Sequence, residues 1–446
     1  MATPLRPLMM LRLLAGRGVF RIGTQAMAVA LLTAWGTATY GDYANAWGTC
    51  SWLLFLPTAA EKAALKILPR TRLTTAAVAG LTLRIAAVPV LVLVAALVTA
   101  LLVLPGSSLV TLYLLAGTWS ASTGMLMTVA GLHRLRGRPS LDATAFTIVA
   151  AIVAATTTVT LVVGLSPTTH LLVLVNGVAV VIAGTLAVLP REWVRAPLPS
   201  RRRLTHAFAR STVLLGITEL LDAITISSLF IVFAISGRVV DSGPFHLTLL
   251  AAGVLCSIAL YQLKLKQPET SMNLRGTEGA TGRLRAARLL RATEFAGLAF
   301  GLALGAALLV PATRETVLAG SEVPPSGVGY VVLAVLVVVE IAMSIALIYG
   351  GYLVENTDSQ VLSLTATAAA LRLVATVVSA FALVPSLGAV GGFSAIVLGL
   401  TAEAASLRRL LRRAHPESEH HRTLARSHPG RSGRNPTSSG SIPGSQ

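Results

Sequence analysis

Two acidic residues lie three positions apart within a long apolar segment of this sequence, and this spacing would let their carboxylates act together. Glu219 and Asp222 fall on one face of a helix, because side chains three residues apart project in similar directions. Two carboxylates so placed repel each other, which favours binding of a cation or a proton. The alternative is that an arginine such as Arg84 or Arg210 neutralises them. The pair is therefore either an ion-coupling site or part of a buried ion pair.

Three more charged residues lie within apolar segments near the carboxyl end. Glu340 and Arg372 are each 16 residues from position 356, the centre of an expected turn, so antiparallel helices would place them at one depth. We interpret them as a structural ion pair. Glu403 lies shortly before Arg408 and Arg409, which we expect to neutralise it.

Arginines near the amino end suggest an anion site. Arg17 and Arg21 are four residues apart and share a helix face. Arg21 either extends toward lipid headgroups or binds an anion. Arg84 lies deeper in its apolar segment, where extension to the surface is harder, and we expect it either to line a cavity or to be paired.

The segments that carry these residues are long enough to cross a membrane. Hydrophobic residues make up 54% of the 446 residues and charged residues only 12%, against about 25% charged in soluble proteins. A crossing helix needs about 20 apolar residues. We predict an all-α polytopic membrane protein with about twelve spans, near 18–38, 44–60, 76–103, 109–131, 141–163, 168–189, 211–236, 245–263, 291–311, 327–352, 360–384 and 387–407.

The basic residues are distributed unequally between the two sets of loops. The termini and the even-numbered loops carry 32 of the 36 Lys and Arg, whereas the alternate loops carry only Arg238 and Arg314. Basic loops face the cytoplasm, so we expect both termini there. One expected cytoplasmic loop, 353–359, has no basic residue. The net charge of +18 then reflects membrane orientation, and we expect no nucleic-acid partner.

Sequence motifs of enzymes are absent. The sequence contains no phosphate-binding loop, HExxH, CxxC, GxSxG or EF-hand spacing. We therefore expect no catalytic residue, no metal and no cofactor. Transport is the function that this pattern favours.

Several short stretches, together with the expected topology, resemble the polysaccharide-transport branch of the multidrug/oligosaccharidyl-lipid/polysaccharide (MOP) exporter superfamily. They are Gly16-Arg17-Gly18, Tyr40-Gly41-Asp42-Tyr43-Ala44, Glu355-Asn356-Thr357-Asp358 and the turn at 383–392. The resemblance implies two six-helix lobes that open alternately to either side of the membrane. The expected domains are an amino-terminal lobe at 1–190, a basic cytoplasmic linker at 191–210, a carboxyl-terminal lobe at 211–413 and a disordered tail at 414–446.

The resemblance also implies a function and a set of site residues. The expected activity is flipping of a lipid-linked saccharide across a bacterial inner membrane for polysaccharide biosynthesis, with a polymerase or glycosyltransferase and membrane lipids as partners. Its substrate-binding residues would be Arg17, Arg21, Lys62, Lys66, Arg70 and Arg84, and its ion-coupling residues Glu219 and Asp222. Two alternatives stay open: a cation-coupled exporter of small organic cations with the same fold, and a non-transporting scaffold of an assembly complex.

Overall fold

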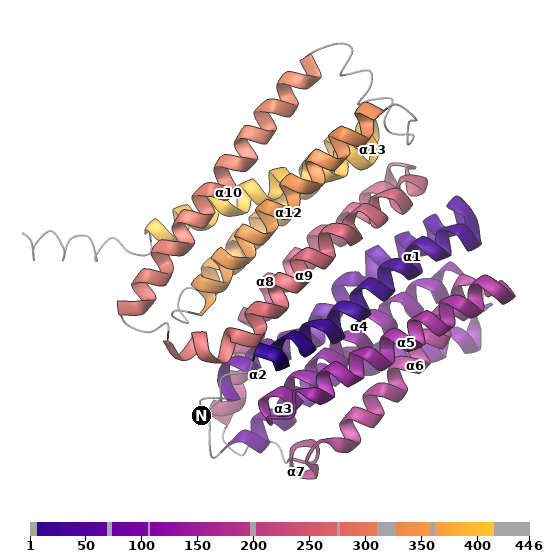
Figure 1. Ribbon diagram of the computed structural model, residues 1–446, viewed down its shortest axis with the longest axis vertical. Helices are drawn as coiled ribbons and strands as arrows, with labels where there is room; N and C mark the ends of the chain where they lie inside the picture. The colour runs from indigo at the N-terminus through magenta and orange to yellow at the C-terminus, as the bar shows by residue number, and fades with distance from the viewer. Residues whose placement is uncertain are drawn as a thin grey trace, which may run out of the picture.

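The protein is a stack of long helices, and the described part contains no strand. The computed structural model describes residues 7–68, 74–105, 108–196, 202–273, 277–309, 327–356 and 362–413. Figure 1 shows most of the long helices running in roughly the same or opposite directions. This architecture is expected in lipid, which offers no hydrogen-bond partners, because a helix satisfies its backbone N–H and C=O groups within its own segment.

The amino-terminal half forms one bundle, α1–α6. Its elements are α1 (Pro7–Cys50), η1 (Ser51–Leu54), α2 (Phe55–Ile67), α3 (Thr75–Val103), α4 (Leu109–Leu135), α5 (Ser140–Val163) and α6 (Pro167–Val188). The helix starts follow local sequence: Ser108 and Ser166 cap α4 and α6 by accepting hydrogen bonds from the backbone N–H groups of Thr111 and Thr169.

The carboxyl-terminal half forms a second bundle, α8–α13, after the short α7 (Arg191–Val194). Its elements are α8 (Arg202–Ile235), η3 (Val239–Asp241), α9 (Ser242–Asn273), α10 (Thr277–Leu309), α12 (Gly327–Glu355) and α13 (Leu362–Arg413). The expected linker 191–210 therefore contains α7 and the first turns of α8. The expected tail 414–446 lies outside the described residues.

Two glycines divide the longest helices. Gly36 has φ 72° within α1, and Gly388 has φ 52° within α13. Left-handed backbone is costly for residues with a Cβ, so glycine is favoured at such breaks. The Gly36 break lies near the end of the first expected span, and the Gly388 break lies at the start of the last, in the turn that carries part of the family resemblance.

Eight of the described helices are long and apolar enough to cross a membrane. The most lipid-like surface belongs to α3, in which only 17% of the most apolar 18-residue window is buried within the protein. Leu102 and Val103 of α3 are 82% and 75% exposed. Large apolar side chains in that position are stable only against lipid or another protein.

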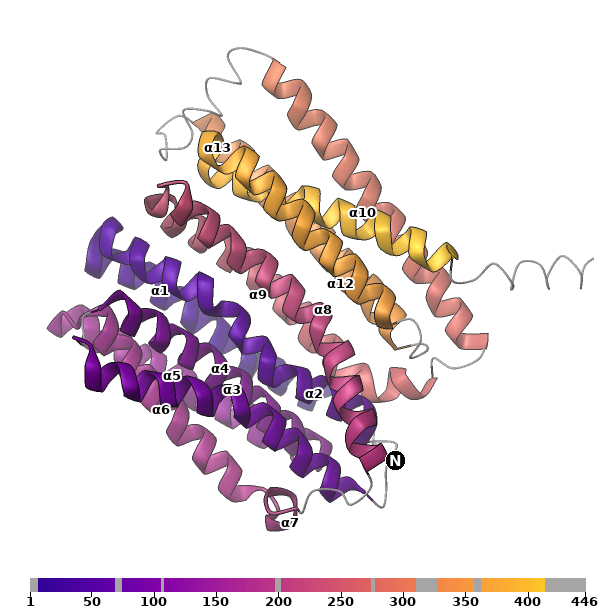
Figure 2. The same ribbon diagram turned by 180° about the vertical axis from the view of Figure 1, so that it is seen from behind.

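Each bundle has its own apolar core. One cluster joins α1, α4, α5 and α6 around Phe146 and Leu174, and a second joins α8, α9, α10, α12 and α13 around Phe245 and Phe393. A third connects the bundles, because Phe208 of α8 packs with residues of α2, α3 and α4. In Figures 1 and 2, α8 and α9 lie between α1–α6 and the helices α10, α12 and α13. The two bundles are thus distinct but in contact.

Candidate functional site

A cavity of about 360 Å³ lies where α2 meets the carboxyl-terminal bundle. Its walls come from η1, α2, α8, α9, α12 and α13. Among the described residues, seven charged side chains line it: Lys62, Glu219, Asp222, Glu340, Glu355, Arg372 and Glu403. Five carboxylates against two cations give this described part of the lining an excess of negative charge.

Arg372 is the centre of one charge cluster in this cavity. Its Nη1 lies 3.1 Å from Oδ1 of Asp222 on α8 and 3.2 Å from Oε2 of Glu403 on the same kinked helix α13. The Arg372 side chain is 10% exposed. A buried guanidinium needs such partners, because an uncompensated charge in an apolar medium is costly.

These partners differ from the expected ones. Glu340 does not form an ion pair with Arg372; its Oε1 accepts a hydrogen bond of 2.9 Å from Ser344 on the same helix. Glu403 is neutralised by Arg372, whereas Arg408 pairs with Glu294 at 2.8 Å. Spacing from the turn placed Glu340 and Arg372 in the same cavity, but it could not fix the rotation of each helix, which brings Arg372 toward α8 instead.

Lys62 and Lys66 of α2 reach the carboxyl-terminal bundle. The Lys62 Nζ lies 2.7 Å from Oε2 of Glu355 and 3.5 Å from Oε1 of Glu219. The Lys66 Nζ donates a hydrogen bond of 3.0 Å to the backbone oxygen of Glu355. Neither Arg84 nor Arg210 neutralises Glu219 or Asp222; Lys62 and Arg372 do so. In this state, the two lysines contact protein groups where anion capture was expected.

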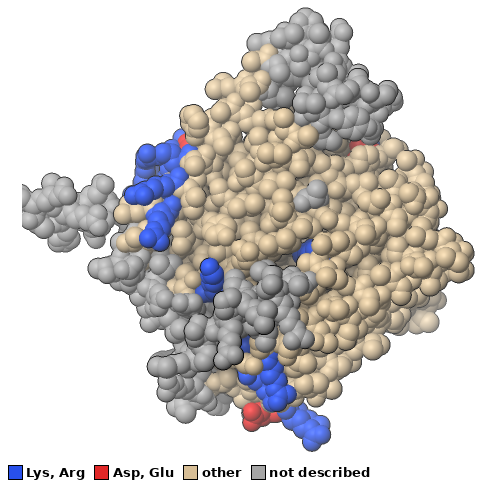
Figure 3. Space-filling model, viewed as in Figure 1, with Lys and Arg blue, Asp and Glu red and all other residues tan. Residues whose placement is uncertain are grey.

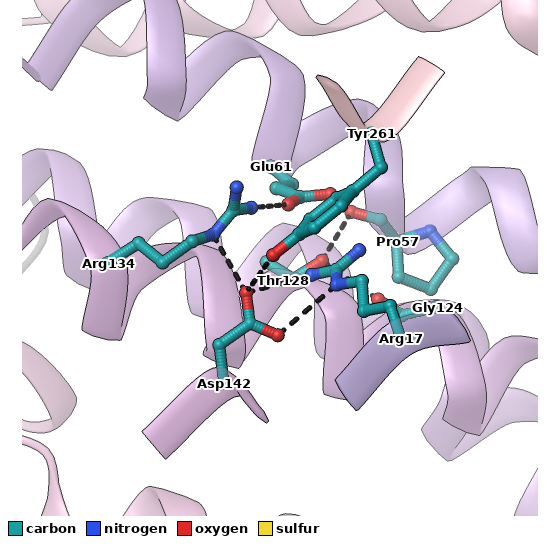
Figure 4. Close-up of polar contacts among 8 residues, drawn as sticks. All are labelled: Arg17, Pro57, Glu61, Gly124, Thr128, Arg134, Asp142 and Tyr261. Atoms are coloured by element: carbon teal, nitrogen blue, oxygen red, sulfur yellow. Dashed lines mark hydrogen bonds and ion pairs between the residues drawn. The ribbon is translucent and has the colours of Figure 1, made fainter. Parts of the chain in front are cut away.

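A second charge cluster lies within the amino-terminal bundle (Figure 4). Arg17 on α1 donates to both carboxylate oxygens of Asp142 on α5, at 3.2 and 3.3 Å. Arg134 on α4 forms ion pairs with Asp142 at 3.0 Å and with Glu61 on α2 at 2.6 Å. Two cations and two acids make this cluster neutral, and its Asp142 side chain is fully buried.

Tyr261 of α9 completes that cluster from the other bundle. Its hydroxyl donates a hydrogen bond of 3.0 Å to Oδ2 of Asp142. The guanidinium carbons of Arg17 and Arg134 lie 4.1 and 5.3 Å from the centre of its ring. Figure 4 shows the tyrosine ring beside both guanidinium groups. Cation–ring contacts at this range are attractive. Arg17, expected at a substrate site, is therefore held by the Asp142 carboxylate and by the rings of Tyr261 and Phe146.

Glycines allow the helices of this cluster to approach one another. A Cβ at Gly16 would lie 2.9 Å from the Cα of Ala143, so a small residue is needed where α1 crosses α5. A Cβ at Gly124 would overlap the backbone oxygen of Leu54. Close contact of this kind is the usual role of small residues in membrane helices. Gly16 belongs to the stretch that carries the family resemblance. Its small size lets α1 approach α5 and so brings Arg17 to Asp142.

Arg21 lies beside the Asp142 cluster, where it shares a small pocket with Arg17 and Tyr261, but it pairs with no acid of either cluster. It lines a pocket of about 170 Å³ between α1, α8 and α9 together with Gln25, Trp47 and His246. No ion pair of Arg21 occurs with any described residue. Of the expected substrate-binding residues that are described, Arg21 is the one that lines a pocket between the bundles without an ion pair to a described residue.

Two expected site residues remain, Arg84 and Arg70, and Arg84 does not line the cavity. Arg84 is exposed and donates from Nη2 to the backbone oxygen of Ala196, beside α7. Near the start of α3, the Arg84 guanidinium is therefore stabilised by a backbone oxygen of the segment after α6. Arg70 lies outside the described residues.

Sequence reasoning missed five residues of these clusters. They are Glu61, Arg134, Asp142, Tyr261 and Glu355. All but Tyr261 are charged residues near an expected span end, where a solvated position is the usual interpretation. Their burial depends on helices distant in sequence, so the sequence alone held no clear signal.

Exposed basic residues gather at one end of the helices. In Figure 3, Lys and Arg side chains lie along the left and lower edges of the visible face, where α13 ends and α7 lies in Figure 1. The broad surface between these edges is almost free of charge. This distribution matches the boundary between an aqueous phase and lipid.

Comparison with solved structures decides the fold. A multidrug-resistance MATE transporter of the MOP superfamily, solved in an outward-facing conformation, has a TM-score of 0.60 at 15% identity, covering 91% of this chain and 95% of its own. A MOP superfamily transporter of Pyrococcus furiosus gives 0.56 at 14% identity over 91% and 95%. A mutant MATE transporter of Vibrio cholerae gives 0.52 at 14% identity over 92% and 96%. The chain has the fold of the MOP superfamily transporters.

The likeness to the MOP fold is structural. No family model matches the chain, and no curated protein matches it significantly in sequence. The MOP fold nevertheless extends over nearly the whole chain, so the expected all-helical membrane architecture is confirmed.

Proposed function

We propose that this chain is a membrane exporter that works by alternating access, with α1–α6 and α8–α13 as its two lobes. The MOP fold and the charged cavity at the contact between the two bundles support this proposal. In repeat-built transporters, one lobe rocks against the other around a central site. Twelve spans with both termini in the cytoplasm complete the proposed topology, in which Gly36 and Gly388 separate adjacent spans.

The excess of carboxylates in the cavity carries the proposal of cation coupling. Glu219 and Asp222 line it from α8, together with Glu340, Glu355 and Glu403. Acidic residues within membrane spans mark pathways for ions and protons. A cation or a proton bound here would lower the electrostatic free energy of five carboxylates buried close together. The gradient of that ion across the membrane would drive export.

A lipid-linked saccharide is the proposed cargo, and Arg21 is the observation that favours it. A guanidinium forms bidentate bonds with phosphate groups, and that of Arg21 lines a pocket between the bundles without an ion pair to a described residue. Arg17, Lys62 and Lys66 are held by protein groups in this state. Capture of a pyrophosphate would therefore centre on Arg21.

A small organic cation is the second candidate cargo, and the cavity charge favours it. Five carboxylates around 360 Å³ would attract a cationic amphiphile, and apolar residues such as Phe55 and Leu347 line the same space. A pyrophosphate would be repelled from this cavity unless it entered elsewhere.

Transport by purified protein in liposomes tests the function and separates the two cargoes. One assay follows movement of a fluorescent lipid-linked saccharide between leaflets, and the other follows ethidium export, each with and without a sodium or proton gradient. Asp222→Asn should remove the gradient dependence. Glu192→Gln, which neutralises an exposed carboxylate on α7 outside the cavity, should retain it. Absence of gradient-driven movement of either cargo would contradict the proposal.

A further inference from the structure

Two hollows between the bundles adjoin each other. The pocket of about 170 Å³ that Arg21 lines and the charged cavity of about 360 Å³ have four lining residues in common. These shared residues are uncharged: Ser51 of η1, Ile226 of α8, and Leu249 and Gly253 of α9. A Cβ added at Gly253 would have no described atom within 4 Å outside its own stretch of helix. The shared wall therefore leaves open space between the two hollows.

The end of this space beside α1 is positive. Arg21 is the only Lys or Arg among the described residues that line the smaller pocket, and no described Asp or Glu lines it. Arg17, one turn before Arg21, is bound to Asp142 instead. The Arg21 guanidinium has no ion pair with a described residue. A guanidinium in this position favours an anion with two oxygens to offer, such as a phosphate.

The other end is negative, around Arg372. The Arg372 Nη1 lies 3.1 Å from Asp222 and 3.2 Å from Glu403, so one cation is shared by two carboxylates. Glu340 lines the same cavity, is 6% exposed, and has no hydrogen-bond partner for its Oε2 among the described residues. A buried carboxylate oxygen without a donor is costly. An ammonium group supplies both the missing donor and a positive charge.

One molecule can reach both ends. Asp222 lies four residues before Ile226 on α8, a rise of about 6 Å, and Ile226 lines both hollows. The acidic end thus begins about one helical turn from the wall that the Arg21 pocket shares with it. This separation is within the span of a substituted sugar or a lipid headgroup.

A cargo with one sign of charge fits only half of this space. An anion bound to Arg21 alone would lie close to the carboxylates, and a cation bound near Glu340 alone would lie close to the unpaired guanidinium. Like charges repel more strongly in an apolar surrounding than in water. A molecule that carries both charges would be attracted at each end.

We propose that the cargo is zwitterionic, with a phosphate that binds Arg21 and an amine that binds Asp222 and Glu340. This inference rests on the proposed function and joins its two candidate cargoes, because the phosphate belongs to one and the amine to the other. Arg21 belongs to the amino-terminal bundle and the two acids to the carboxyl-terminal bundle. The cargo therefore bridges the bundles, which ties its binding to their movement.

Binding of matched compounds to the full-length protein tests this inference. Calorimetry in an uncharged maltoside detergent at low ionic strength compares three sugars. Glucosamine phosphate carries both charges, N-acetylglucosamine phosphate keeps only the phosphate charge, and glucosamine keeps only the ammonium. A lipid pair, dioctanoyl phosphatidylethanolamine and dioctanoyl phosphatidylmethanol, makes the same comparison on a lipid headgroup.

Five variants are compared with the parent protein. Arg21→Ala and Arg21→Lys change the positive end, and Glu340→Gln changes the negative end while keeping an acceptor for Ser344. Arg210→Ala and Glu192→Gln are the matched controls, because both residues are exposed and line neither hollow.

The parent should bind the compound with two charges at least about tenfold more tightly than either compound with one. In Arg21→Ala, binding of glucosamine phosphate should weaken about tenfold, whereas glucosamine should bind as well or better. In Glu340→Gln, glucosamine phosphate should again weaken, whereas N-acetylglucosamine phosphate should bind as well or better. A purely structural role would weaken all three compounds alike. Arg21→Lys should give an intermediate loss, and it serves if Arg21→Ala folds poorly.

The two sets of compounds identify the source of the charges. Preference for the two-charge compound among the sugars indicates an amino sugar phosphate, and preference among the lipids indicates an amine-bearing headgroup. Equal binding of one-charge and two-charge compounds in both sets would overturn the inference.

Failure of this inference is distinguishable from failure of the proposed function. If gradient-driven export occurs and neither set shows a preference for two charges, the zwitterionic cargo is wrong while export stands. If the two-charge compound binds selectively and no gradient-driven movement occurs, the binding site stands while export is wrong.

Discussion

Tyr261 and Asp142 come from opposite bundles, and the tyrosine hydroxyl donates a hydrogen bond of 3.0 Å to the buried carboxylate. Asp142 already accepts from Arg17 and pairs with Arg134. This contact between the bundles therefore uses a neutral donor, and the two arginines already pair with Asp142 without it. Such a contact can break without leaving a charge uncompensated, as the proposed movement of one lobe against the other requires.

The first prediction concerns the stability of this cluster. Asp142→Asn leaves Arg17 without its carboxylate, and breaking a buried pair costs about 3–5 kcal/mol. We expect a much lower unfolding temperature in detergent and less folded protein in the membrane. Tyr261→Phe removes one hydrogen bond, worth about 0.5–1.5 kcal/mol, and keeps the ring over the guanidinium groups. Equal stability of the two variants would contradict the assignment.

The second prediction concerns the partners of Arg372. A double-mutant cycle of Arg372→Leu with Glu403→Gln should give a coupling free energy of about 0.5–3 kcal/mol, as residues in one ion-pair network do. The cycle of Arg372→Leu with Glu340→Gln is the matched control, since Glu340 lines the same cavity without an ion pair to Arg372. Its coupling should be smaller. Thermal unfolding of purified protein measures both, and a stronger coupling with Glu340 would show that the expected pair forms after all.

The third prediction concerns Arg21. If this residue binds a pyrophosphate, Arg21→Ala should abolish movement of a lipid-linked saccharide while the amount of folded protein stays normal. Arg21→Lys should keep part of the activity, because the point charge survives but bidentate bonding does not. Arg210→Ala, which removes an exposed arginine of α8, provides the comparison. Wild-type transport by Arg21→Ala would exclude it from the substrate site.

The fourth prediction concerns orientation in the membrane. In a Cys50→Ser, Cys256→Ser background, Ser166→Cys, between α5 and α6, should react with an impermeant thiol reagent added to intact cells. Arg138→Cys, between α4 and α5, should react only after the membrane is opened. Both positions are exposed, so access and not burial decides the labelling. Reaction of Arg138→Cys in intact cells would reverse the proposed topology.

The sequence by itself determined the architecture. Apolar segments of membrane length and a one-sided distribution of arginine predicted an all-helical membrane protein, because lipid tolerates little else. The resemblance around Gly16 and the 383–392 turn predicted the fold that comparison with solved structures confirms. The sequence also indicated four unusual residues, because a charge within an apolar span is costly unless it is paired or hydrated. They are Glu219, Asp222, Glu340 and Arg372.

Only the tertiary structure decided which charges meet. Arg372 binds Asp222, 150 positions away, and Lys62 binds Glu355, 293 positions away. Helical spacing fixes which residues share a face of one helix, but the rotation and approach of two helices depend on packing along their whole length. Close contacts at Gly16 and Gly216 set that approach. For this reason the sequence could identify buried charges, whereas their partners, and thus the division between paired and available cations, followed only from the fold.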